Sequence, residues 1–239
     1  MPLPGWADHL VVAALILVLP VRGAWEYRRM LRRLRSGAAD VRVREYRSTM
    51  IMQWSLAAIV VLIWWLGGRP AALLGFSLPA GAPSMAGAAV TMLGLAFLFA
   101  QWRAITRLDD EGLAALRSQL DAVADFLPRT DREAAAFRRL AVTAGICEEI
   151  VYRGYLIWYF AAYAGAWPAA LLAGGAFGVF HLYQGAAGVV KTGLTGIVMG
   201  ILYVGTGSLL WPAILHAAID LQGGASARRA LVPGSVQPR

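Results

Sequence analysis

Long apolar runs separated by short polar stretches dominate this chain. Runs of about 15 to 20 apolar residues suit helices that cross a hydrocarbon layer about 30 Å thick. Two clear runs cover residues 50–66 and 84–102, and four more lie near residues 140–164, 168–183, 192–204 and 209–222. The pattern predicts a helical membrane domain that takes up nearly the whole chain.

The first apolar run, residues 10–21, is short and contains Pro20. A secretory signal would have a basic leader, but Asp8 and His9 precede this run and arginines follow it. We therefore expect an uncleaved first helix. The predicted fold is all-α, a polytopic transmembrane helical bundle of about seven spans plus one amphipathic interfacial helix.

The amphipathic helix is expected in the polar segment 108–138. Apolar residues recur there at helical spacing between charges of both signs, at Leu113, Leu116, Leu120, Val123 and Leu127. Pro128 should end this helix. Thr130 and Glu133 have the spacing of a capping box, so the next helix should begin near Asp131.

Arginine placement predicts the orientation. The segment after the first span holds nine arginines, whereas residues 67–83 hold only Arg69. Because basic loops stay in the cytoplasm, alternation puts the N-terminus outside and the C-terminus inside, in the inner (plasma) membrane. The corresponding partition is 1–107 for the N-terminal membrane helices, 108–138 for the amphipathic segment, 139–224 for the catalytic membrane core and 225–239 for a disordered tail.

Composition argues against a soluble domain, a nucleic-acid-binding protein and a disulfide-bonded scaffold. Hydrophobic residues make up 59% of the chain and charged residues 15%, whereas soluble domains have about 45–50% and about 25%. The net charge of +8 comes from arginines beside apolar spans, with Lys191 the only lysine. This arrangement indicates a lipid bilayer as partner, and no nucleic acid. A single cysteine, Cys147, excludes a disulfide framework.

Ionisable residues inside three of the last four spans are the candidate site. A charge at the bilayer centre costs about 2.5 kcal/mol or more, so such residues are functional candidates. Glu149 and Arg153 are four apart in the order that favours a same-face ion pair, as support or as part of the chemistry. Glu148 points elsewhere on the helix and is left free. His181 lies in the fifth span, and the last span carries His216 with Asp220.

These residues resemble three motifs of the CPBP family, the glutamate-dependent intramembrane proteases that include type II CAAX prenyl endopeptidases and bacteriocin-processing, Abi-like proteins. EExxxR corresponds to Glu148, Glu149 and Arg153, FxxxH to Phe177 and His181, and the final HxxxN or HxxxD to His216 and Asp220. The resemblance covers about residues 139–224. It implies an endopeptidase acting on a membrane-associated peptide or protein, prenylated or carrying a sorting signal.

The resemblance further implies that Glu148 and His181 activate a water and that His216 and residue 220 hold the oxyanion. An ionised Asp220 cannot donate a hydrogen bond, so it must be protonated, orient His216 or help bind a metal. No cofactor is firmly implied. A zinc ion is the alternative, with Glu148, His181, His216 and Asp220 as candidate ligands, and members of this family are often called metalloproteases.

Two other functions stay open from the sequence. Intramembrane Glu, His and Arg also form relays in proton-coupled transporters, although here the charged groups gather toward one face and no inverted repeat is visible. A non-catalytic immunity or scaffold protein is the third reading. The substrate and the oligomeric state do not follow from the sequence.

Overall fold

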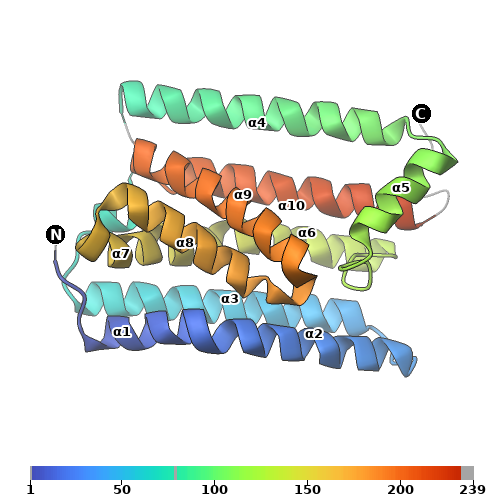
Figure 1. The fold of residues 1–239 in the computed structure, drawn as a ribbon, viewed down its shortest axis with the longest axis horizontal. Helices are drawn as coiled ribbons and strands as arrows, with labels where there is room; N and C mark the ends of the chain where they lie inside the picture. Colours follow the sequence, from blue (N-terminus) through green and yellow to red (C-terminus); the bar gives the residue numbers. More distant parts are fainter. Residues whose placement is uncertain (1, 78–79, 233–239) are drawn as a thin grey trace.

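The computed structural model describes residues 2–77 and 80–232, which fold into helices with no strand in these ranges (Figure 1). In chain order the elements are α1 (Trp6–Ala13), η1 (Ala14–Val18), α2 (Leu19–Arg35), α3 (Val41–Leu66), η2 (Ala71–Leu74), α4 (Ala82–Thr106), α5 (Asp110–Leu120), α6 (Asp131–Glu148), η3 (Glu149–Leu156), α7 (Ile157–Ala164), α8 (Ala166–Phe180), η4 (Leu182–Gln184), α9 (Gly185–Thr206) and α10 (Leu210–Leu231). The all-α prediction is confirmed.

Four of these helices are long and apolar enough to cross a membrane: Trp6–Arg35, Val41–Leu66, Ala82–Thr106 and Leu182–Thr206. The first joins α1, η1 and α2 into one helix. Helix α8 is apolar but has only 15 residues. The count of about seven spans is therefore not confirmed, because length and hydropathy support four.

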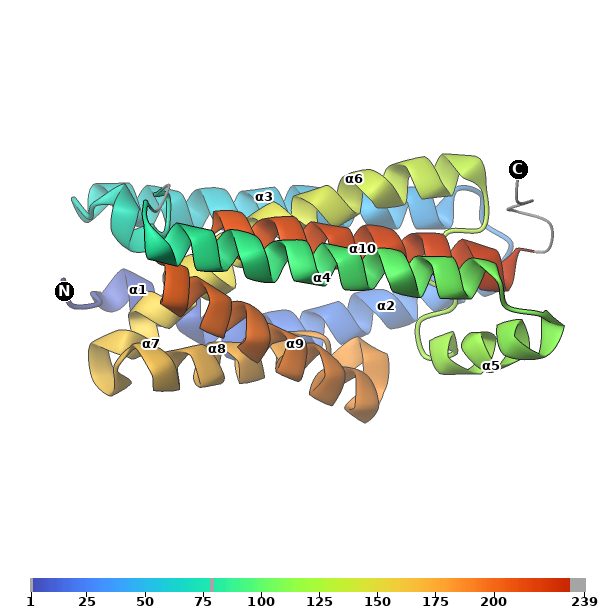
Figure 2. The ribbon, with the colours of Figure 1, turned by 90° about the horizontal axis from the view of Figure 1, so that it is seen from above.

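Helices α8 and α9 form a hairpin whose turn stops short of the end of the bundle at which α5 lies (Figure 2). Glycines allow these helices to touch. A Cβ atom on Gly178 would lie 2.5 Å from the carbonyl oxygen of Val189, and one on Gly196 would lie 3.0 Å from the Phe177 ring. A Cβ atom on Gly200 would lie 3.1 Å from the Cβ atom of Ala170, so small residues let the two helices pack closely. His181 lies at the turn of this hairpin, between α8 and η4, and is half-buried.

The arginine-rich segments gather at one end of the bundle, beside α5 and the C-terminal end of α10 (Figure 1). Arg132 contacts both carboxylate oxygens of Asp40 at 2.9 and 3.0 Å, and Arg228 contacts Asp131 at 2.8 Å. These bonds join the starts of α3 and α6 and the end of α10. Helices that cross the bundle in alternating directions would bring these three helix ends to the same side.

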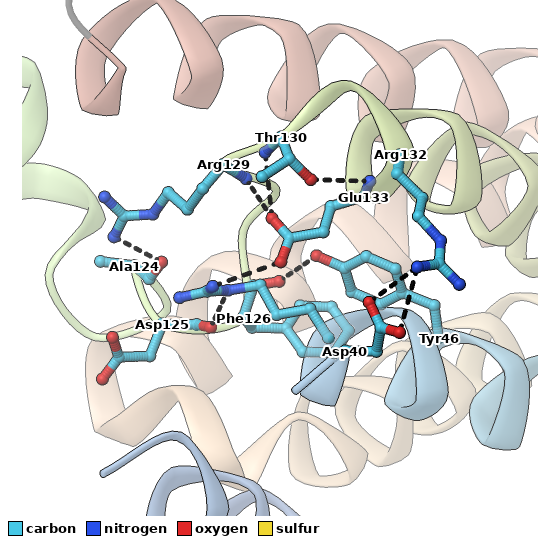
Figure 3. A network of polar contacts seen from close by, with 10 residues as sticks. Asp40, Tyr46, Ala124, Asp125, Phe126, Arg129, Thr130, Arg132 and Glu133 are labelled. Carbon is cyan, nitrogen blue, oxygen red and sulfur yellow. Dashed lines mark hydrogen bonds and ion pairs between the residues drawn. The ribbon is translucent and has the colours of Figure 1, made fainter. Parts of the chain in front are cut away.

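A polar network holds residues 121–130 against α3 and α6 at the same end (Figure 3). The Tyr46 hydroxyl donates to the carbonyl of Phe126, and Arg42 Nε donates to the carbonyl of Asp125 at 2.7 Å. The Glu133 carboxylate accepts from the backbone N–H of Arg129 and of Thr130 at 2.7 and 3.0 Å. The predicted capping box and the helix start at Asp131 are confirmed.

The predicted amphipathic helix is shorter than the pattern indicated. Helix α5 ends at Leu120, and turns carry Val123 and Leu127. These two residues pack with Tyr46, Phe137 and other residues of a hydrophobic cluster. The partition at 138/139 falls inside α6, which runs without interruption from Asp131.

The prediction that a disordered tail begins at residue 225 is wrong for the described part of that segment. Helix α10 continues to Leu231, with Ala227 and Ala230 fully buried. Gly224 is a point of close packing and not a helix stop, because a Cβ atom there would lie 2.5 Å from the Phe137 ring. The rest of the predicted tail, 233–239, lies outside the described residues.

A second polar cluster lies at the end of the bundle where the N-terminus lies. Asp8 is 1% exposed and accepts two hydrogen bonds from Arg69, at 2.8 and 2.5 Å, and one from the Tyr155 hydroxyl at 2.9 Å. The Arg69 guanidinium stacks 4.2 Å from the Trp158 ring centroid. This cluster ties the first helix to the core, far from the arginine-rich end.

Candidate active site

A cavity of about 360 Å³ is the candidate site. Its walls come from α2, α3, α6, α9, α10, the turn around His181 and the segment 123–127 that the network of Figure 3 holds in place. Polar side chains lining it include Gln53, Glu148, Arg153, His181, Tyr183, His216 and Asp220. Of the five residues predicted to be catalytic, Glu148, His181, His216 and Asp220 line this cavity, whereas Glu149 does not.

Glu149 is the fully buried centre of a charged cluster. Its Oε1 atom accepts from Arg153 Nη1 at 2.7 Å and from His216 Nδ1 at 2.6 Å. Arg153 also donates to the carbonyl of Gly196 at 3.3 Å and lies 4.5 Å above the Phe177 ring. The ion pair expected from the four-residue spacing is present, and it fixes both the guanidinium and the imidazole.

Glu148 has different partners from its neighbour. Its Oε1 atom accepts a hydrogen bond from Gln53 Nε2 at 2.7 Å, and its Oε2 atom lies 3.7 Å from His216 Nε2. The side chain is 9% exposed and lines the cavity. Because Glu149 takes the Arg153 bond, Glu148 retains an oxygen that is free to accept a proton.

His216 stands between three carboxyl groups. Nδ1 is bonded to Glu149, while Nε2 lies 3.7 Å from Glu148 Oε2 and 3.7 Å from Asp220 Oδ2. The side chain of Asp220 is 37% exposed, against 0% for Glu149. Three carboxyl groups therefore lie around one imidazole. Arg153 forms an ion pair with one of them, Glu149.

His181 has its tautomer set by the backbone. Its Nδ1 atom lies 2.8 Å from the carbonyl oxygen of Phe177, which can only accept. Nδ1 therefore carries the proton, and in the neutral ring Nε2 is the acceptor. The Phe177 ring contacts both imidazoles, with centroid distances of 4.7 Å to His181 and 5.8 Å to His216. The FxxxH spacing thus supplies both a carbonyl and a packing surface.

The described residues contain no cluster of side chains arranged as zinc ligands. No group of three His, Cys, Asp or Glu side chains there has the arrangement that could hold a metal ion. His216 Nδ1, one of the candidate donor atoms, is engaged by Glu149. Activity without a metal ion stays a prediction, with zinc as the alternative.

Two features of the site were missed from the sequence. Gln53, 6% exposed, lies in the second predicted span and was read as part of an apolar run. A lone amide in such a run is costly in lipid, which is the signal that could have marked it. The other feature is the π-helical turn η3, which begins at Glu149 and whose eight residues are all buried. Such turns are frequent at functional sites, but no residue pattern marked this one.

In a comparison with protein families, residues 131–222 match the model of the family described as type II CAAX prenyl endopeptidase Rce1-like. Searches of curated proteins and of solved structures each give no match. The match contains all three motifs, confirms the resemblance over this segment and supports an intramembrane protease in general terms.

Proposed function

From the Rce1-like segment at residues 131–222, we propose that this protein is a glutamate-dependent intramembrane endopeptidase that hydrolyses a peptide bond of a membrane-associated protein or peptide. The observation that carries the proposal is the different bonding of two adjacent acids. Glu149 is committed to Arg153 and His216, whereas Glu148 lines the cavity with Oε2 free of Arg153.

Glu148 is the general base in this mechanism. A water in the cavity donates one hydrogen to Glu148 Oε2 and the other to His181 Nε2. The water oxygen bonds to the carbonyl carbon of the substrate while its proton passes to Glu148. Glu148 then returns this proton to the leaving nitrogen, the C–N bond breaks, and a carboxylic acid and an amine are released.

His216 stabilises the oxyanion that forms on the substrate. With protons on both ring nitrogens, it is held through Nδ1 by Glu149 and donates its Nε2–H to the developing charge. The two carboxyl groups 3.7 Å from Nε2 suit a donor at that atom. Asp220 then orients His216 from one helical turn away, and an ionised Asp220 need not donate a hydrogen bond.

The position of the arginine-rich end indicates how the protein is oriented in the membrane. Positive charge favours the cytoplasm, so this end, with the loop that walls the cavity, faces the cytoplasm and the N-terminal end faces outside. A membrane-associated substrate reaches the cavity from the bilayer or from its inner surface. A CAAX-like carboxyl terminus and a sorting signal both fit this approach.

A library of membrane-anchored peptides in liposomes tests the proposal. The purified protein is reconstituted with the library, and new termini are identified by mass spectrometry. We expect wild type to cleave at least one peptide. Glu148→Gln and His181→Gln should leave all of them intact while shifting the melting temperature by less than about 6 °C. Cleavage by folded Glu148→Gln at the wild-type rate would exclude this mechanism.

A further inference from the structure

Gln53 is a polar residue of the candidate active-site cavity that lies outside the segment 131–222 matched by the family model. It belongs to α3, 95 residues away from Glu148 in the chain, within a helix that is apolar enough to span a membrane. Its side chain is 6% exposed and lines the same cavity as Glu148 and His216. A buried amide in lipid is unfavourable unless something in the protein requires it.

Among the described residues, the side chain of Gln53 makes one hydrogen bond, and its partner is Glu148. Gln53 Nε2 donates to Glu148 Oε1 at 2.7 Å, and among the described residues Gln53 Oε1 has no hydrogen-bond partner although it is buried. An amide kept only to stabilise the fold would be expected to satisfy both of its polar ends. The bond to Glu148 is the interaction that Gln53 contributes.

That bond distinguishes the two oxygens of Glu148. Oε1 is engaged by Gln53, whereas Oε2 is on the side of His216 Nε2, 3.7 Å away. Without the amide, the carboxyl group could rotate about its last torsion, which is broad for glutamate. The oxygen that accepts the proton would then no longer be fixed relative to His216.

We propose that Gln53 is a positioning residue for catalysis, which holds Glu148 Oε1 so that Oε2 faces the attacking water. This inference rests on the proposed function. It adds α3, outside the Rce1-like segment, to the machinery of the site.

Gln53→Met is the test, because methionine has nearly the same shape but cannot donate the hydrogen bond. It removes the bond to Glu148 and also removes a buried oxygen without a partner, so these two effects on stability oppose each other. We expect kcat to fall roughly 10- to 100-fold, as for a misplaced catalytic group, with little change in KM. The melting temperature should stay within about 4 °C of wild type.

Thr91→Val is the matched control. Thr91 is also a buried polar residue in a helix apolar enough to span a membrane, and its Oγ1 has no hydrogen-bond partner among the described residues, but it does not line the cavity. It should leave kcat unchanged. Gln53→Asn keeps the amide but is one methylene too short to reach Glu148, so it should also lower kcat, which provides a second variant if Gln53→Met does not fold.

The possible results separate the inference from the proposed function. Wild-type kcat in folded Gln53→Met or Gln53→Asn overturns the role of Gln53 and leaves the role of Glu148 intact. A lower melting temperature with unchanged kcat assigns Gln53 to the fold alone and also overturns it. If wild type cleaves no peptide of the library, the proposed function fails and this inference fails with it.

Discussion

Glu149→Gln should destabilise the protein far more than the same change at the adjacent residue. The substitution keeps the shape of the side chain and removes its charge. Glu149 Oε1 accepts two charge-assisted hydrogen bonds, from Arg153 at 2.7 Å and from His216 at 2.6 Å, and the carboxylate is completely buried. Removing it leaves the Arg153 guanidinium, whose side chain is 2% exposed, without its ion-pair partner.

The magnitude follows from these contacts. Breaking a buried ion pair by removing one partner costs about 3–5 kcal/mol, and two charge-assisted hydrogen bonds of about 1.5–3 kcal/mol each give a comparable sum. For a chain of this size, 1 kcal/mol lowers the melting temperature by about 2–4 °C. Glu149→Gln should therefore lower it by about 6–20 °C.

Glu148→Gln is the matched control, because it makes the same chemical change one residue earlier. Glu148 has one hydrogen bond, from Gln53, and lies 3.7 Å from His216. Its replacement should shift the melting temperature by less than about 6 °C. The assay is thermal unfolding of both variants in the same detergent. Equal shifts for the two variants would refute the assignment of Glu149 to support and of Glu148 to chemistry.

Three further predictions concern other parts of the molecule. His181→Gln should lower kcat by at least about 100-fold without loss of stability, because it removes the imidazole acceptor expected at the water; kinetics at saturating substrate check this, and unchanged kcat contradicts it. Removing metal with a chelator should leave full activity, whereas loss restored by added zinc would support the metal hypothesis. Arg69→Met should lower the free energy of unfolding by about 3–5 kcal/mol, because buried Asp8 loses its ion-pair partner. The protein that stays folded should cleave at the wild-type rate. A melting temperature equal to that of wild type would contradict the role of this ion pair in holding the first helix to the core.

Local spacing was the most informative part of the sequence. Glu149 with Arg153 and His216 with Asp220 are four residues apart, and the structure shows a 2.7 Å ion pair for the first and a 3.7 Å approach for the second. Helical geometry alone places such residues on one face. The resemblance implied that Glu148 and His181 act together, and the structure shows both residues on the walls of one cavity.

Contacts between distant segments were beyond the reach of these patterns. Gln53 meets Glu148 across 95 residues, and nothing in the apolar run around it identifies its partner. The last apolar run was expected to end near residue 222, and two glycines follow it, but α10 continues to Leu231 and Gly224 allows close contact with Phe137. Gly has this double use, as a helix stop and as a site of close approach, and tertiary packing decides between them.

The most direct test of the central claim compares the termini of membrane proteins in cells that express wild type or Glu148→Gln at equal levels. If Glu148 is the base of an intramembrane endopeptidase, a set of new termini appears with wild type and is absent with Glu148→Gln. The same termini in both strains, with folded protein in the membrane of each, would contradict the account.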